Sequence, residues 1–173
     1  SNITDWIMWT PTVKGFWTPE NVASVTSQGV ESRANLTLKP NSDLRIEANA
    51  IFAITSSINT SPNSSSYGKQ LPYIPLYSAS AGVGCVWKRW EANYKWRYYS
   101  ERYTSFSGTS FKGSVVDGYH LSDVSLCRNF DTKNKVHFKV RIEINNLFDT
   151  YYQSVLSRPM PPRNYALSLE CKF

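Results

Sequence analysis

The sequence lacks any long apolar run, and its 173 residues include only three cysteines and two histidines. No stretch approaches the roughly 18 apolar residues that a membrane-spanning helix needs. The scarce cysteines and histidines, without a Cys-x-x-Cys spacing, leave little material for a zinc site. The net charge is only +6, which argues against a strongly basic nucleic-acid-binding protein. The chain opens at Ser1 without a methionine or a signal peptide, so we expect a mature or excised segment.

Aromatic residues are abundant at 14%, and with the β-branched residues they exclude a disordered chain. Their arrangement is more informative, because apolar and polar residues alternate strictly over 90–98, 136–144 and 165–173. A helix would blur this pattern, since its period is 3.6 residues and that of a strand is 2. No segment carries helical spacing of any length. The sequence therefore predicts an all-β protein.

The alternation predicts about eight antiparallel up-and-down strands, approximately over 3–9, 22–39, 43–58, 71–88, 89–103, 117–129, 135–148 and 163–173. Short turns at 40–43, 88–89 and 131–134 alternate with long connections near 10–20, 59–70, 104–118 and 149–162. A transmembrane β-barrel sorts its connections in this way, with short turns in the periplasm and long loops outside. Because eight is an even number, we expect both chain ends on the periplasmic side.

The two faces of these strands also favour a membrane barrel. The apolar face carries Trp87, Trp90 and Tyr77 near strand ends, which suits an aromatic girdle. The other face carries long charged side chains that fit a wet lumen. A soluble β-sandwich with a solvated outer face is the alternative that periodicity alone leaves open; strand length and the sorting of the loops argue against it.

The three cysteines are expected to be free thiols that serve as small apolar residues, with Cys85 and Cys171 on the apolar face and Cys127 expected there as well. Cys85, Cys127 and Cys171 fall on the fourth, sixth and eighth predicted strands, which are not neighbours in an up-and-down sheet. A disulfide needs Cα atoms within about 7 Å of each other. No bridge among the three is therefore predicted.

The last predicted strand ends in an alternating apolar series that closes on an aromatic residue. Such an ending resembles the assembly signal of outer-membrane barrels, carried here by Tyr165, Leu167, Leu169 and Phe173. A final strand that closes a barrel must match its lipid-facing residues to the membrane.

Two groups of motifs resemble TonB-dependent outer-membrane receptors. The first comprises Asn146-Leu147-Phe148-Asp149, Tyr152, the proline-rich segment 159–165 and the terminal Phe173; the second comprises Asp5-Trp6-Ile7, Trp9, Pro11, 19–22 and Gly29-Val30-Glu31. One departure is Pro162, where the family often has glycine, so the bend there should differ in shape. The resemblance extends from residue 3 to residue 173.

The resemblance implies uptake of a scarce, bulky nutrient across the bacterial outer membrane. Receptors of this kind close about 22 strands around a plug, so residues 1–173 would be the C-terminal part of the barrel, with no plug domain present. The implied partners are outer-membrane lipid, the remainder of the receptor, TonB through an N-terminal part, and a surface lipoprotein. Residues 9–11 and 14–17 resemble vitamin B12 (corrinoid) receptors of Bacteroides-type bacteria; iron–siderophore receptors come next. The alternative is a small outer-membrane barrel for anchoring, adhesion or other binding without transport.

Ligand contacts are expected on the long connections, where aromatic rings and cationic side chains occur together. The candidates are Phe16, Trp17, Tyr67, Arg102, Tyr103, Tyr151 and Arg158. Exposed aromatic residues there could equally be girdle residues or rest on lipopolysaccharide.

No catalytic residue, cofactor or metal site is predicted. His120 and His137 are the only histidines, each in a predicted strand, and neither a G-x-S-x-G nor a His-Glu-x-x-His element occurs. Asp117 and Asp123 stand apart, without the dense spacing of a calcium loop. We therefore expect a protein that is not an enzyme.

Overall fold

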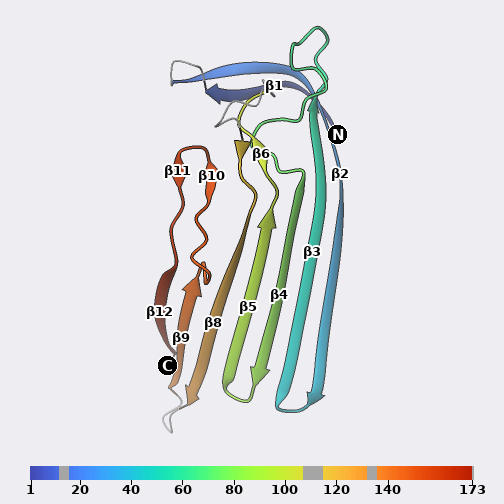
Figure 1. The fold of residues 1–173 in the computed structure, drawn as a ribbon. Coiled ribbons are helices and arrows are strands. Elements are labelled where there is room, and N and C mark those ends of the chain that lie inside the picture. Colours follow the sequence, from blue (N-terminus) through green and yellow to red (C-terminus); the bar gives the residue numbers. More distant parts are fainter. Residues whose placement is uncertain (12–15, 107–114, 132–135, 173) are drawn as a thin grey trace.

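The computed structural model describes residues 1–11, 16–106, 115–131 and 136–172. Its main element is an eight-stranded sheet, in the order β1-β2-β3-β4-β5-β8-β9-β12 (Figure 1). The bounds are β1 Asn2–Pro11, β2 Trp17–Asn41, β3 Leu44–Asn59, β4 Tyr77–Trp87, β5 Trp90–Tyr99, β8 Tyr119–Asp131, β9 His137–Asn145 and β12 Asn164–Lys172. All neighbours are antiparallel. The predicted up-and-down architecture is confirmed.

Two small hairpins extend the long connections beyond this sheet. One joins β6 (Arg102–Tyr103) to β7 (Val115–Val116), and the other joins β10 (Gln153–Val155) to β11 (Arg158–Pro159). The predicted strand over 89–103 is therefore two strands, β5 and β6.

The eight-stranded sheet is open. Among the described residues β1 pairs only with β2, and β12 pairs only with β9. Figure 1 shows β1 lying across the top of the sheet, whereas β12 stands at its opposite edge. The chain on its own therefore forms a curved wall and not a closed eight-stranded barrel.

Strand β2 is 25 residues long because it pairs first with β1 and then with β3. Its first part, Trp17–Thr26, pairs with β1, and its later part, from Val25 to Asn41, pairs with β3. The N-terminus is held at this junction, where Ser27 N–H donates to the Ser1 carbonyl at 2.9 Å.

Two expectations about the N-terminal region are wrong. Ser27 faces Ser57, near the end of β3 that leads into a long connection, so Ser1 lies at the long-connection end. The connection predicted over 10–20 is also short, because Thr10 and Pro11 pair with Thr18 and Trp17 and only residues 12–16 lie between the two strands. Backbone pairing thus extends both strands into a segment that its Trp and Pro residues had marked as a loop.

From the end of β2 onward, short and long connections alternate as predicted. Ser42-Asp43 joins β2 to β3 and Lys88-Arg89 joins β4 to β5, whereas 60–76, 100–118 and 146–163 connect strands at the other end. Asn41 helps to close its turn by accepting a hydrogen bond on Oδ1 from Asp43 N–H at 3.0 Å. Strand β4 begins at Tyr77 and not at residue 71, since Pro72 and Pro75 lack the N–H that a ladder requires.

The apolar side chains form a continuous face along the sheet. At mid-height the cross-strand register places Val83 beside Tyr94, Tyr94 beside Val124, and Val124 beside Ile144. The Tyr94 hydroxyl lies 2.9 Å from Ser122 Oγ, which satisfies two polar groups on this face. Trp87 and Trp90 lie beside the short turn, and at the other end the rings of Phe52 and Tyr77 stack at 6.4 Å.

The opposite face carries the charged side chains, and Cys127 belongs to it. Cys127 is buried and pairs in register with Glu91 on β5 and Arg141 on β9. Its expected position on the apolar face is therefore wrong. The expectation of free thiols is confirmed, since Cys85, Cys127 and Cys171 form no disulfide.

A small apolar core lies beneath the long connections. Val25, Leu71 and Phe106 are buried together, with Ile74 packed against them. In the described part of the chain, no helix has the length and apolar character needed to cross a membrane.

Candidate functional site

Three tyrosines form a cluster on the charged face at the long-connection end of the sheet. Tyr99 and Tyr119 face each other in register across β5 and β8, with ring centroids 5.5 Å apart. The ring of Tyr152, from the connection 146–163, lies 4.7 Å from that of Tyr119. Burial raises the pKa of the Tyr152 hydroxyl above its usual value, and Tyr119 acts in the same direction. The phenol therefore remains protonated and can donate a hydrogen bond.

Arg102 ties this tyrosine cluster to the β10–β11 hairpin. Its guanidinium carbon lies 5.1 Å from the centroid of the Tyr119 ring, and Nη2 donates to the Gln153 carbonyl at 3.1 Å. The residue is only 7% exposed. A planar cation that stacks on one ring and bonds to a backbone carbonyl fixes the relative position of two loops.

A hollow of about 240 Å³ opens beside the tyrosine cluster, and we call it the outer hollow. Both hairpins and the start of β8 contribute to its wall, so its shape depends on the packing of the long connections. The lining residues are Val115, Val116, Asp117, Gly118, Tyr119, Tyr151, Tyr152, Gln153 and Leu156. The combination of phenol rings with one carboxylate suits an aromatic or metal-containing small molecule.

Asp123, on the charged face, holds the last long connection to the sheet. One carboxylate oxygen pairs with Arg97, and the other accepts the backbone N–H of Asn146 at 3.0 Å. Asn146 begins the turn of the Asn146–Asp149 motif, in which its side chain bonds to both the N–H and the C=O of Thr150, at 2.8 and 2.9 Å. The motif therefore ties the last long connection to the sheet.

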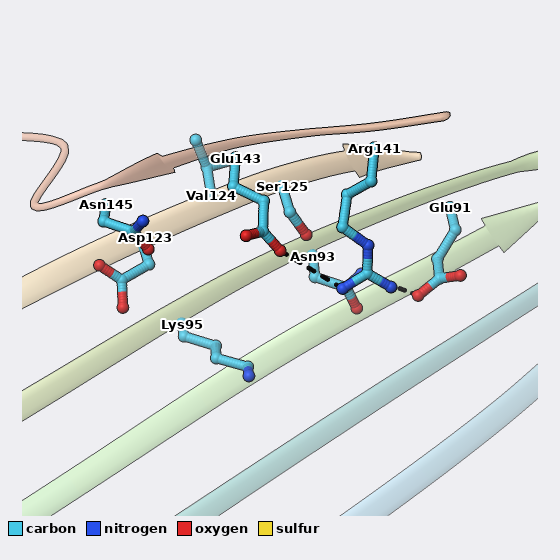
Figure 2. Close-up of a pocket in the computed structure, with 9 residues that line it drawn as sticks. All are labelled: Glu91, Asn93, Lys95, Asp123, Val124, Ser125, Arg141, Glu143 and Asn145. Carbon is cyan, nitrogen blue, oxygen red and sulfur yellow. Dashed lines mark hydrogen bonds and ion pairs between the residues drawn. The ribbon is translucent and has the colours of Figure 1, made fainter. Parts of the chain in front are cut away.

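The charged face holds a second hollow of about 250 Å³, shown in Figure 2. Arg141 lies between Glu143, at 3.3 Å, and Glu91. Glu91 in turn pairs with Lys139 at 3.3 Å. Such long side chains of both signs, paired across neighbouring strands, fit the polar interior of a water-filled barrel.

The structure brings only some of the predicted ligand residues together. Arg102 and Tyr151 lie at or beside the outer hollow, and Tyr103 lines a neighbouring one of about 220 Å³ with Phe106 and Lys69. Phe16, Tyr67 and Arg158 are exposed but do not line the outer hollow. Trp17 pairs with Pro11, and its side chain lies outside the described part of the structure.

The predicted assembly residues share the apolar face of β12. Tyr165, Leu167 and Leu169 pair with Ile144, Ile142 and Val140, and all three are more than 65% exposed. Phe173 lies outside the described residues.

Sequence reasoning missed Tyr99, Tyr119, Tyr152 and Asp123 as members of the site. The doublet Tyr98-Tyr99 was a usable signal, since alternation sends one tyrosine of a strand doublet to each face. Within residues 1–11, 16–106, 115–131 and 136–172, no three His, Cys, Asp or Glu side chains gather in a metal-binding arrangement.

Replacing Arg102 with alanine is expected to release the β10–β11 hairpin from the tyrosine cluster. The change removes a charge-assisted hydrogen bond and a stacked cation. The hairpin should therefore lose about 1.5–3 kcal/mol of the free energy that holds it against the cluster. Limited proteolysis of the folded protein should then cut within 146–163 roughly tenfold faster. Arg158→Ala, on the exposed β11, is the matched control and should leave the rate unchanged. Equal cleavage of the two variants would contradict the positioning role of Arg102.

Comparison with known proteins agrees with this architecture. Residues 1–147 match the sequence model described as "TonB dependent receptor-like, beta-barrel". No curated protein sequence matches the chain. Among solved structures, the copper transporter OprC matches with a TM-score of 0.67 and 19% identity, over 97% of this chain and 27% of its own.

Two further structures match over 97% of this chain. BauA, the ferric preacinetobactin receptor from Acinetobacter baumannii, has a TM-score of 0.67 and 19% identity, over 25% of its own length. The ferric-catecholate import receptor Fiu from E. coli K12 has a TM-score of 0.64 and 15% identity, over 23% of its length. The chain thus spans about a quarter of these solved proteins. It belongs to the TonB-dependent receptor family, as part of an outer-membrane β-barrel.

Proposed function

We propose that the chain is the C-terminal part of an outer-membrane receptor that imports a scarce, bulky nutrient, a corrinoid in first place and a ferric siderophore in second. The three similar structures are described by their titles as handling copper, ferric preacinetobactin and ferric catecholates. Metal-containing cargo is common to all of them and to corrinoids. The motif around Trp9–Pro11 supports the corrinoid. Residues 14 and 15 of the other corrinoid-like motif, 14–17, lie outside the described part.

The tyrosine cluster beside the 240 Å³ hollow is the observation that carries this proposal. Tyr151 is 75% exposed at its rim, and the protonated Tyr152 hydroxyl can donate to an oxygen or nitrogen of the cargo. Aromatic faces bind large ring systems, and the paired lumenal charges beneath provide a polar path. The other half of such a site would come from segments beyond these residues.

The open sheet supports a place within a larger barrel and disfavours the small-barrel alternative. The edge of β12 and the edge of β2 over 28–40 have no strand partner among the described residues. In a complete receptor these edges would pair with further strands, the lumen would hold a plug, and TonB would act on that N-terminal part. A surface lipoprotein remains a proposed partner. A reading frame that continues upstream into plug-encoding sequence is the expected genomic finding, and its absence would restore the small-barrel alternative.

Tyr151→Ala in the full-length receptor is expected to weaken cargo binding about five- to tenfold, the loss of about one aromatic contact. Phe148→Ala is the matched control, because Phe148 is 66% exposed but does not line the hollow. Cobalamin and ferric siderophores should each be titrated by calorimetry. If only a ferric siderophore binds, the proposed cargo is the ferric siderophore and not the corrinoid. Absence of affinity for both classes would contradict the proposed uptake.

A further inference from the structure

One arginine lies on the apolar face of the sheet, near its short-turn end. Arg128 of β8 pairs in register with Trp90 and Val140, and its neighbours two residues away on the same face are Leu126 and Phe130. It is three residues from the end of β8, a distance of about 10 Å along a strand. In the family's orientation, this is the depth of the inner-leaflet headgroups.

The guanidinium of Arg128 is held against two aromatic rings. Its carbon lies 4.6 Å from the centroid of the Trp90 ring and 4.8 Å from that of Phe130. On the adjacent turn, Lys88 places its ammonium 5.5 Å from the centroid of Trp87. We call Trp87, Lys88, Trp90, Arg128 and Phe130 the rim patch. Its cations are positioned by rings that themselves face acyl chains.

The cations of the rim patch differ in their partners from two arginines of the charged face. Arg97 and Arg141 each pair with a carboxylate there. In the described part of the chain, no carboxylate lies within ion-pair distance of Arg128 or Lys88. The Arg128 guanidinium is therefore exposed, held in place by aromatic rings and not paired with a carboxylate of the described residues. At headgroup depth, such a group is suited to bind phosphate.

We propose that the rim patch binds the phosphate of an inner-leaflet phospholipid, with preference for the anionic glycerol headgroup. The guanidinium fork donates to the phosphate oxygens, Lys88 adds a second positive charge, and the Trp and Phe rings contact the upper acyl chain. A lipid with a net negative charge is attracted by both cations, whereas the ammonium group of phosphatidylethanolamine is repelled by them. The inference depends on the membrane placement of the family and not on the cargo.

Native mass spectrometry of the full-length receptor in mild detergent tests this proposal. Phosphatidylglycerol should be retained by the wild type, and Arg128→Gln should lower the bound fraction about fivefold or more. Arg128→Lys, which keeps the charge but loses the fork, should give an intermediate value. Arg45→Gln is the matched control, because Arg45 lies near a short turn at similar depth and on the opposite face, beside Glu47. It should leave lipid retention unchanged.

Three results would overturn the proposal. Retention of phosphatidylglycerol by Arg128→Gln at the wild-type level would show that the guanidinium is not the binding group. An equal loss in Arg45→Gln would indicate an effect of net charge alone. Full displacement of the lipid by inorganic phosphate would show that the site recognises a free anion, since the acyl contacts would then contribute nothing.

Discussion

Replacing Asn146 with alanine is expected to destabilise the folded protein by roughly 3 kcal/mol. Asn146 is 4% exposed, and its amide bonds to both backbone groups of Thr150. Two such hydrogen bonds contribute about 1 kcal/mol each. Its φ is +53°, and alanine in this left-handed region adds about 1 kcal/mol. Denaturant unfolding of the full-length receptor in detergent measures the loss.

Glycine at the same position separates the two causes. Asn146→Gly removes the same hydrogen bonds but accepts the positive φ without strain, so it should be about 1 kcal/mol more stable than Asn146→Ala. The matched control is Asn145→Ala. Asn145 donates one exposed hydrogen bond to Asn164 Oδ1 at 3.0 Å, and its loss should cost less than about 1 kcal/mol. Equal stability of all three variants would contradict the structural role of the turn.

The expected role of Asn146 explains why a short motif could be recognised without its function being known. The motif closes its own turn, and Asp149 then accepts the backbone N–H of Arg163 at 2.8 Å, just before β12 begins. The order of the residues in this motif is therefore enough to indicate the TonB-dependent receptor family. The hydrogen bond from Asn146 N–H to Asp123 on β8 depends on pairing between distant strands, which no local pattern specifies.

The fold was predictable where alternation is strict and turns are short. Trp90–Tyr98 shows a clear apolar face, and the Lys88-Arg89 turn leaves little freedom in the pairing of β4 with β5. Strand β8 was harder, because both of its faces mix polar and apolar residues. Leu121 and Cys127 share a face with Asp123, so only pairing with β5 identifies that face as the charged one. The misplacement of Cys127 has this cause.

The candidate site was less predictable than the sheet. Aromatic and cationic residues on the long connections could be found from composition, but their contacts arise from how separate connections fold together. Arg102 is the clearest case: the sequence suggested an exposed ligand residue, and the structure places it in the packing between two hairpins. Loop packing of this kind depends on long-range contacts, which periodicity does not report.

Replacing Val124 with arginine is expected to destabilise the barrel in a bilayer by about 2–4 kcal/mol, because the charge would enter lipid near the membrane midplane. Val124 lies in the middle of β8, four residues along the strand from Arg128, and is flanked by Tyr94 and Ile144 on the apolar face. Ser125→Arg is the matched control. Ser125 faces the lumen opposite Glu143, so arginine there gains a partner and should change stability by less than about 1 kcal/mol. Reversible unfolding in liposomes provides both values.

A second arginine substitution distinguishes a membrane from an ordinary apolar core. Leu38 shares the apolar face with Val124 but lies beside the Asn41–Asp43 turn, where a long cation reaches the headgroups. Leu38→Arg should therefore cost only about 0–1 kcal/mol, since the penalty of a charge falls with distance from the midplane. The core of a soluble protein has no such gradient, because there the free-energy cost of a charge depends on how buried the side chain is and not on its position along the strand. Equal free-energy penalties at Leu38 and Val124 would contradict a lipid-facing sheet, whereas a lipid bilayer around the sheet predicts a much larger penalty at Val124.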